Sequence, residues 1–369
     1  MSDTSLPESI GLSTERLERA YRLLAVAVER GELPAAALLV ARHGVALPAR
    51  AFGRLRLDGA SPAARPDTIF LVASVTKPVA VAGAMLLVER GQLTLDDPVC
   101  AHIPEFAENG KEGVLVRHLM THTSGLPDML PENYDLRREH APLSEFARRV
   151  CRLALEFEPG TRIQYQSMGI LILAQIAERI AGMPFPEFLR QELFAPLSMS
   201  DTSLGVGPLN TERIAHVNVP EEMRGTDWGW NTPYWWGLGA PWGGMFSTVS
   251  DIWRFLQMFL NGGRFAGVQV LGRATAEAMV RDQTGAMPEL PPAERKVQSW
   301  GLGWRRFPFG STFGDLLSPL AFGHSGATGT VVWADPAREL ACALFTTEPS
   351  ANSRRLLGRC SNAVAAAAL

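Results

Sequence analysis

The sequence predicts an α+β protein in which an antiparallel β-sheet is flanked by helices and a mainly helical domain is inserted. Apolar strand-like segments lie near both ends of the chain, helical spacing dominates the middle, and no long linker or internal repeat is present. Because segments from the two ends can close one sheet, we expect residues 1–90 and 240–369 to form a discontinuous sheet domain. Residues 91–239 then form an inserted helical domain with an aromatic-rich loop.

The two ends of the chain supply the expected sheet and the helices that cover it. Ser13 and Thr14 precede a segment with apolar residues at helical spacing, as N-capping residues do. A second helix is expected over residues 353–367. The expected hairpin strands are 38–40 with 45–47 and 330–333 with 340–345, and 68–72 is expected as a short strand or an extended entry to the next helix.

Helical spacing of apolar residues continues through the middle of the chain. The expected helices cover residues 74–89, 116–121, 143–155, 168–181, 185–193 and 248–261. We expect Ser247 or Ser250 to cap the last of these. Between residues 228 and 242, five of the nine tryptophans gather. Their rings could form the wall of a substrate pocket or pack as a loop under the sheet.

Composition and charge exclude several classes of protein. The 369 residues are 46% hydrophobic and 20% charged, as in ordinary globular proteins, and the net charge of −3 gives no electrostatic attraction to nucleic acid. No apolar run reaches the roughly 20 residues of a membrane span, and the N-terminus lacks the pattern of a signal peptide. We therefore expect a cytoplasmic protein without membrane or nucleic-acid partners. Four widely spaced cysteines predict neither a disulfide framework nor a zinc site.

Ser74 and Lys77 stand three residues apart at the start of the apolar helix over residues 74–89, so both side chains lie on one face. Serine becomes a nucleophile when a base takes its proton, and lysine can be that base only when burial keeps it neutral. Only three of the 35 basic residues are lysines, and arginine could not take this role. The alternative interpretation is a surface lysine beside a helix-capping serine.

Two further segments carry polar groups that suit the same chemistry. Tyr165 immediately precedes the helix over residues 168–181 and could exchange a proton with the serine and the lysine. Alternatively, it is an aromatic plug with a hydrogen-bonded hydroxyl. His324, Ser325 and Gly326 lie just before an apolar strand, which suits substrate recognition with the next backbone N–H as an oxyanion donor. The alternative is a turn histidine.

Two competing sites are less consistent with the sequence. Ser325 stands in Gly-His-Ser-Gly, which resembles the start of a nucleophile elbow, but that class needs a histidine after the serine, and His324 is the last histidine. His118 and His122 are four residues apart, as zinc ligands can be, yet no third ligand follows from the pattern. We expect no metal and no cofactor.

Six segments occur in the order known for one superfamily, covering about residues 12–350. They are Ser74-Val-Thr-Lys77, His118-Leu-Met-Thr-His-Thr-Ser-Gly-Leu-Pro127, Pro159-Gly-Thr-Arg-Ile-Gln-Tyr-Gln-Ser167, Ala195-Pro-Leu-Ser-Met-Ser-Asp-Thr202, Gly243-Gly-Met-Phe-Ser-Thr-Val-Ser-Asp251 and Gly323-His-Ser-Gly326. Together they resemble the class C β-lactamase and penicillin-binding-protein-like serine hydrolases, particularly the family VIII carboxylesterases. This resemblance implies a serine β-lactamase-like fold.

The resemblance also implies roles for individual residues. Ser74 would be the acylated nucleophile, Lys77 its base partner and Tyr165 a proton relay, and the backbone N–H groups of Ser74 and Ala327 would form the oxyanion hole. The expected substrate-binding residues are Ser167, His324, Ser325, Gly326, Trp236 and Trp242.

Two departures from the family pattern concern the substrate. Ser167 stands where β-lactamases usually have asparagine, and His324 replaces the lysine that helps hold a β-lactam carboxylate. Both changes favour esters, so we expect a serine carboxylesterase for short-chain esters. One alternative is a β-lactamase or D-amino-acid peptidase or amidase, in which Arg354 or Arg355 would hold the anion. Another is a non-catalytic scaffold of the same fold. The sequence does not predict an oligomeric state.

Overall fold

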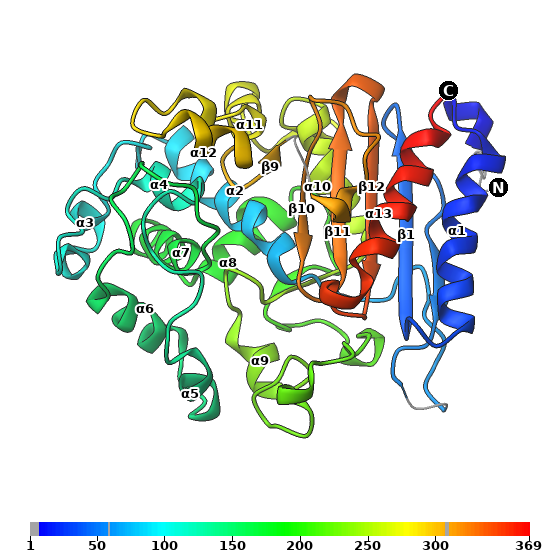
Figure 1. Cartoon of the computed structure of the whole chain (residues 1–369), viewed down its shortest axis with the longest axis horizontal. Helices are drawn as coiled ribbons and strands as arrows, with labels where there is room; N and C mark the ends of the chain where they lie inside the picture. The colour runs from blue at the N-terminus through cyan, green and yellow to red at the C-terminus, as the bar shows by residue number, and fades with distance from the viewer. Residues whose placement is uncertain (1–6, 58–59, 307–309) are drawn as a thin grey trace.

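A large antiparallel sheet with helices on both faces adjoins a mainly helical region in this computed structural model (Figure 1). The structure describes residues 7–57, 60–306 and 310–369. Residues 1–6, on which the expectation of a missing signal peptide partly rests, lie outside the described residues. The first and last described segments lie close together, and Leu12 forms a bridge with Ala368.

The strands of the large sheet come from both ends of the chain, as predicted. They are β1 (Ala35–Arg42), β2 (Val45–Ala46), β3 (Arg50–Gly53), β9 (Arg305–Arg306), β10 (Phe322–Gly326), β11 (Thr330–Asp335) and β12 (Leu340–Thr346). One smaller sheet contains β4 (Phe70–Leu71), β5 (Ser203–Leu204) and β6 (Met245–Ser247). Another contains β7 (Arg264–Phe265) and β8 (Val268–Gln269). In the large sheet the order is β2-β1-β12-β11-β10-β9, with β3 beside β1.

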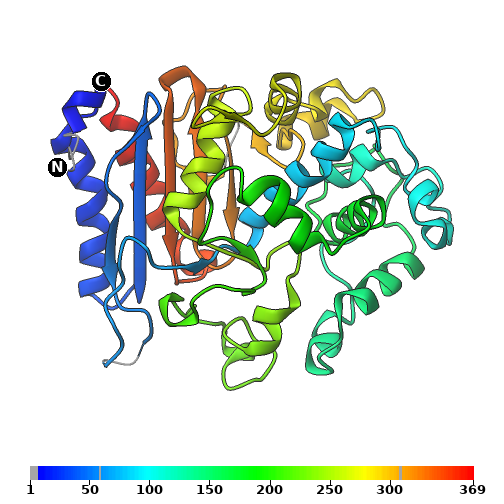
Figure 2. The ribbon, with the colours of Figure 1, turned by 180° about the vertical axis from the view of Figure 1, so that it is seen from behind.

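The helices lie on the faces of the sheet and in the adjoining region. They are α1 (Thr14–Glu29), α2 (Thr76–Glu89), α3 (Val99–His102), α4 (Val116–Met120), α5 (Asn133–Arg138), α6 (Leu143–Arg152), α7 (Met168–Ala181), α8 (Phe185–Leu189), α9 (Pro233–Leu238), α10 (Val249–Leu260), α11 (Arg273–Val280), α12 (Pro292–Val297) and α13 (Ser350–Ala367). Helices α1 and α13 cover one face of the sheet, and α10 covers the other (Figures 1 and 2).

The sheet is buried on both faces because each strand alternates between two cores. In β1, Leu38 and Val40 point into the core beneath α1 and α13, whereas Ala37 and Leu39 belong to the larger core on the α10 side. Residues buried on both faces make β1 a continuous apolar run in the sequence. The antiparallel pairing of β1 with β12 joins the two ends of the chain, which confirms the predicted fold class.

Helix α2 lies between the sheet and the helical region and is buried along nearly its whole length (Figure 1). It packs against α7, the apolar helix at the centre of the helical region. The division of the chain at residues 90 and 240 stays a prediction.

Two local predictions differ from the structure. Thr248, rather than Ser247 or Ser250, caps α10, because its extended backbone lets the side chain accept a hydrogen bond from the Asp251 N–H at 3.1 Å. The helix expected over residues 185–193 changes after α8 into a π-helical turn, η4 (Arg190–Phe194). The remaining expected helices and strands are present within a few residues of their expected bounds.

Within the described residues, no single helix has the length and apolar character needed to cross a membrane. One bent pair, Met168–Ala181 with Phe185–Phe194, meets that criterion by length and composition only.

Gly326, at the end of β10, is expected to be intolerant of a side chain. An added Cβ would lie 2.3 Å from both the Val72 carbonyl oxygen and the Thr330 hydroxyl oxygen. Gly326→Ala should therefore lower the free energy of unfolding by about 1–3 kcal/mol, measured by urea denaturation. Gly113→Ala is the control, since nothing lies within 4 Å of its added Cβ. Equal effects of the two substitutions would contradict the prediction.

Candidate active site

Ser74 lies in a short 3₁₀ turn, η2 (Ala73–Val75), that leads into α2. The preceding Ala73 has a φ of 45°, a left-handed conformation that costs a residue with a Cβ about 1–3 kcal/mol and turns the chain sharply. Hydroxyls of Thr328 and Thr330, at the turn between β10 and β11, donate to the Leu71 and Val72 carbonyls at 2.6 and 2.9 Å. These bonds fix the strained turn against the sheet while the Ser74 side chain stays partly exposed.

Lys77, the second residue of α2, is fully buried, with its Nζ 3.0 Å from Ser74 Oγ. The same Nζ donates to the Trp242 carbonyl oxygen at 2.9 Å. Burial lowers the pKa of Lys77 to about 7, with the nearby charge of Asp128 opposing this shift and that of Arg305 adding to it. A large fraction of the amine is therefore neutral near neutral pH and able to accept a proton from the serine.

Tyr165 lies beside both Ser74 and Lys77, and the Nζ of Lys77 is 4.6 Å from the centre of the phenol ring. Burial raises the pKa of Tyr165, and a hydrogen bond with Ser74 partly offsets that rise. His122 and Trp300 pack against the phenol with ring centres 4.7 and 5.9 Å away. The phenol is thus held in one orientation and carries its proton at neutral pH.

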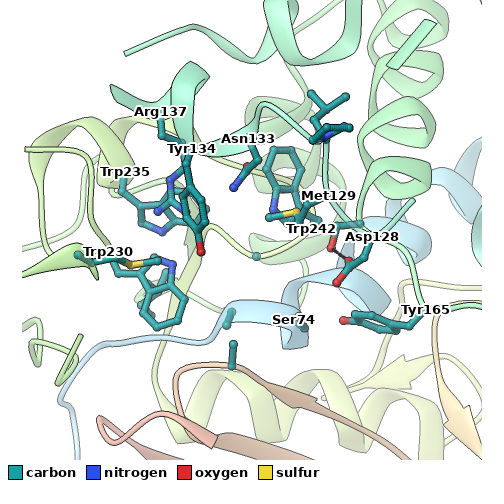
Figure 3. Close-up of a pocket in the computed structure, with 18 residues that line it drawn as sticks. Ser74, Asp128, Met129, Asn133, Tyr134, Arg137, Tyr165, Trp230, Trp235 and Trp242 are labelled. Carbon is teal, nitrogen blue, oxygen red and sulfur yellow. Dashed lines mark hydrogen bonds between the residues drawn. The ribbon is translucent and has the colours of Figure 1, made fainter. Parts of the chain in front are cut away.

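Ser74 and Tyr165 open onto a cavity of about 360 Å³ (Figure 3). Its wall combines the nucleophile region, the segment after residue 127 and the aromatic-rich loop. The lining residues are Leu71, Ala73, Ser74, Asp128, Met129, Leu130, Pro131, Asn133, Tyr134, Arg137, Tyr165, Ser167, Met223, Trp230, Trp235, Trp242, Gly243 and Ala327. The cavity is large enough for a small ester and mostly apolar.

Asp128 brings a negative charge into this wall close to the lysine. Its Oδ1 accepts a 2.6 Å hydrogen bond from Ser167 Oγ, and its backbone oxygen accepts one from the Ser167 N–H at 3.1 Å. Asp128 raises the pKa of Lys77 against the effect of burial. Ser167 therefore orients the carboxylate that tunes the lysine.

Arg305 brings a positive charge close to the phenol of Tyr165. Its guanidinium carbon lies 5.8 Å from the centre of the Tyr165 ring and 5.2 Å from that of Trp300. Its Nε is buried without a hydrogen-bond partner, and no carboxylate pairs with it among the described residues. The sheet determines the position of Arg305, because this residue of β9 pairs with Gly323 in β10.

The structure places the expected site residues in two groups. Ser74, Tyr165, Ser167, Trp242 and Ala327 line the cavity, and Lys77 lies directly beneath Ser74. His324, Ser325, Gly326 and Trp236 are not part of this wall.

Packing explains the positions of the residues outside the wall. The His324 ring is buried, with Nδ1 2.9 Å from the Ser325 backbone oxygen, and burial holds the pKa of His324 well below its usual value. Trp236 packs edge-on against Phe246 and donates from Nε1 to the Trp230 carbonyl oxygen at 2.9 Å. Trp230 and Trp235 take the place in the wall that was expected for Trp236. Direct substrate contacts by His324, Ser325, Gly326 and Trp236 stay predictions.

Asp128, Arg137 and Arg305 are charged groups at or near the site that sequence analysis missed. Asp128 immediately follows the family-like segment that ends at Pro127, so its position carried a usable signal. Arg305 is one arginine among many, and only the pairing of β9 with β10 brings it to the phenol. Arg354 and Arg355, the expected anion-binding candidates, are both exposed on α13.

The two histidines considered as zinc ligands have other partners. Nδ1 of His118 accepts from the Leu115 N–H, and Nδ1 of His122 accepts from the Gln166 N–H. Over the described ranges, no group of three or more His, Cys, Asp or Glu side chains could hold a metal ion.

A serine–lysine pair at the start of a helix between an antiparallel sheet and a helical region defines a class, the β-lactamase-like serine hydrolases. The chain belongs to the Beta-lactamase family, whose model matches residues 21–366. It is therefore a serine hydrolase of that family, as the sequence resemblance predicted.

Several relatives and structures are similar over nearly the full chain. Esterase EstB of Burkholderia gladioli is 33% identical, over 87% of this chain and 86% of the relative. A protein of Escherichia coli O157:H7, provisionally named a D-alanyl-D-alanine carboxypeptidase, is 26% identical over 94% of this chain and 85% of its own. The crystal structure of a family VIII carboxylesterase shares the fold with a TM-score of 0.76 at 20% identity, covering 96% of this chain and 99% of that one.

Removing the charge of Asp128 should shift the pH dependence of the reaction. We expect the neutral form of Lys77 to be the reactive one, and with a pKa of about 7 this makes kcat/KM rise with pH through about 7 in the wild type. Asp128 raises the pKa of Lys77, so Asp128→Asn should move this rise to lower pH. The measurement is kcat/KM for a p-nitrophenyl ester against pH. An unchanged or upward shift would contradict the assigned role of Asp128.

Proposed function

We propose that the protein is a serine carboxylesterase that hydrolyses short-chain esters through an acyl-enzyme on Ser74. The observation that carries the proposal is the buried Lys77 amine, 3.0 Å from Ser74 Oγ and with a pKa near 7. The cavity is small and mostly apolar at its aromatic wall, which suits a short acyl chain. The 33% identity to an esterase supports the same substrate class.

Acylation follows from the protonation states of the two partners. Neutral Lys77 takes the proton of Ser74 as Oγ attacks the ester carbonyl carbon, and the backbone N–H groups of Ser74 and Ala327 stabilise the resulting oxyanion. When the intermediate collapses, the C–O bond to the alcohol breaks and the Tyr165 phenol gives its proton to the leaving oxygen. Tyr165 then regains a proton from the Lys77 ammonium, so the alcohol leaves neutral.

Deacylation uses the same groups in the reverse direction. A water molecule attacks the acyl carbon and passes a proton through Tyr165 to Lys77. The bond to Ser74 breaks, and the serine oxygen takes back a proton from the lysine. The carboxylic acid is released and the free enzyme is restored. The raised pKa of Tyr165 keeps the phenol protonated at neutral pH, so in both steps it passes on one proton as it takes up another and does not rest as a phenolate.

A D-amino-acid peptidase or β-lactamase is the second candidate. The Arg305 guanidinium favours it, because this cation lies 5.8 Å from the centre of the Tyr165 ring, although outside the cavity wall, and its charge would attract a carboxylate on the leaving group. The provisional carboxypeptidase name of the Escherichia coli relative points to the same chemistry. Arg305 is therefore the candidate anion-binding residue for this function, in place of Arg354 and Arg355, which are exposed on α13.

Lys77→Arg should abolish turnover although it keeps a positive charge. Arginine stays protonated in a protein, so it cannot accept the proton of Ser74. We expect kcat/KM for p-nitrophenyl butyrate to fall by at least about 1,000-fold, in the range typical of lost general-base catalysis. Ser74→Ala should in addition abolish labelling by a fluorophosphonate, whereas the wild type gains one adduct by mass spectrometry. Near-normal turnover in Lys77→Arg would rule out a lysine base, and an unlabelled wild type would favour a non-catalytic scaffold.

The two candidate functions differ in their preferred substrate. For the esterase, kcat/KM for p-nitrophenyl butyrate should exceed that for a chromogenic cephalosporin by at least about 100-fold, or about 2.7 kcal/mol of transition-state stabilisation. A D-alanyl-D-alanine peptide serves as the amide substrate in the same comparison. Faster turnover of the cephalosporin or the peptide would replace the esterase proposal with the second candidate.

A further inference from the structure

Helix α5 places two polar side chains on the cavity wall away from the reacting groups. Asn133 and Arg137 are four residues apart, so they lie on one face of this helix. Both line the cavity (Figure 3). Both are also buried, with 7% and 2% of their surfaces exposed.

The guanidinium of Arg137 is a buried cation held by aromatic rings. It lies 4.3 Å from the ring centre of Trp235 and 5.1 Å from that of Trp228, and Nη2 donates to the Trp228 carbonyl oxygen at 3.3 Å. Burial lowers the pKa of Arg137 to about 10, so the group stays charged at neutral pH. Aromatic faces attract a cation but do not neutralise it.

Arg137 has no anionic partner in the part of the chain that the structure describes. No carboxylate lies within ion-pair distance, and its Nε is buried without a hydrogen-bond partner. The neighbouring Arg138, which is exposed, pairs with Asp135 on the same helix. Buried charges in proteins are normally paired, because an unpaired one loses its hydration without compensation. A cation left unpaired in a cavity wall therefore indicates an anionic ligand.

Asn133 adds a neutral hydrogen-bond donor to the same part of the wall. Figure 3 shows the nitrogen end of its side chain directed into the cavity. An amide NH₂ and a guanidinium together are donors that suit the two oxygens of a carboxylate. Of the described lining residues, Arg137 is the only cation, and the only anion, Asp128, is bonded to Ser167 near the lysine.

The position of Arg137 relative to the catalytic groups defines which part of an ester it would meet. Figure 3 shows Tyr165 on one side of Ser74, and Tyr134, Trp235 and Arg137 on the other. The leaving alcohol must lie toward Tyr165, which gives it a proton. The acyl chain therefore extends from Ser74 along the aromatic wall toward α5.

We propose that the acyl pocket recognises esters whose acyl group ends in a carboxylate, with Arg137 and Asn133 holding that carboxylate. The preferred substrates are then monoesters of short dicarboxylic acids. This inference rests on the proposed esterase function and specifies its substrate class. In this arrangement the aromatic wall contacts the methylene chain of the acyl group, and Arg137 at the far end of the wall favours a terminal carboxylate over an uncharged end.

The test compares charged and neutral esters of equal chain length. The mono-p-nitrophenyl esters of glutaric and adipic acid are paired with p-nitrophenyl pentanoate and hexanoate, and the rate without enzyme is subtracted. We expect the wild type to give a higher kcat/KM for the charged member of at least one pair by about 10-fold or more, typical of one hydrogen-bonded charge pair. A wild-type preference for the neutral ester in both pairs would overturn the inference, whether or not any variant folds.

Variants of helix α5 test whether Arg137 causes the preference for charged esters. Arg137→Gln should lower the charged-to-neutral ratio of kcat/KM by about 10-fold or more, and Arg137→Lys should give an intermediate ratio because it keeps the charge but loses the planar fork. Arg138→Gln, on the same helix but outside the cavity wall, is the matched control and should leave the ratio unchanged. An Arg137→Gln variant that lowers both rates equally would show a structural role and overturn the inference. If the wild type hydrolyses none of the four esters, the proposed esterase function is refuted instead.

Discussion

The buried amine of Lys77 is the constraint on which the rest of the site depends. Among the described residues it has no carboxylate within ion-pair distance, and its nearest polar contacts are Ser74 Oγ and the Trp242 carbonyl oxygen. Two oxygens cannot compensate for the lost hydration of an ammonium, so burial favours the neutral amine. The same constraint explains why the position is a lysine in a chain in which 32 of the 35 basic residues are arginines.

The fold brings three distant segments to this amine. The strained turn at Ala73 presents Ser74 from the start of α2, the loop before α7 brings Tyr165, and the turn after β10 brings Ala327. Hydrogen bonds from the Thr328 and Thr330 hydroxyls to the Leu71 and Val72 carbonyls hold the first and last of these together, although Ser74 and Ala327 are 253 positions apart in the sequence.

Charge is distributed unevenly around the cavity, and this gives each part a separate task. Asp128 and Arg305 oppose each other in their effect on Lys77, one favouring its protonated form and the other its neutral form. Arg137 lies away from them, enclosed by aromatic rings, where its charge is available to a ligand. The aromatic loop thus forms the apolar wall and also supports the cation, so the two interpretations of this loop from the sequence are not exclusive.

The sequence by itself determined the fold class and most helices and strands, because these depend on local periodicity. It also predicted Ser74, Lys77 and Tyr165 from short motifs in a fixed order, and the structure places these three side chains together. Only the tertiary structure decided which side chains face the cavity. Trp235 lines it and the adjacent Trp236 does not, a difference set by how α9 packs. Arg305 reaches Tyr165 only through strand pairing. Such placements depend on contacts between residues far apart in the chain, which no local pattern encodes.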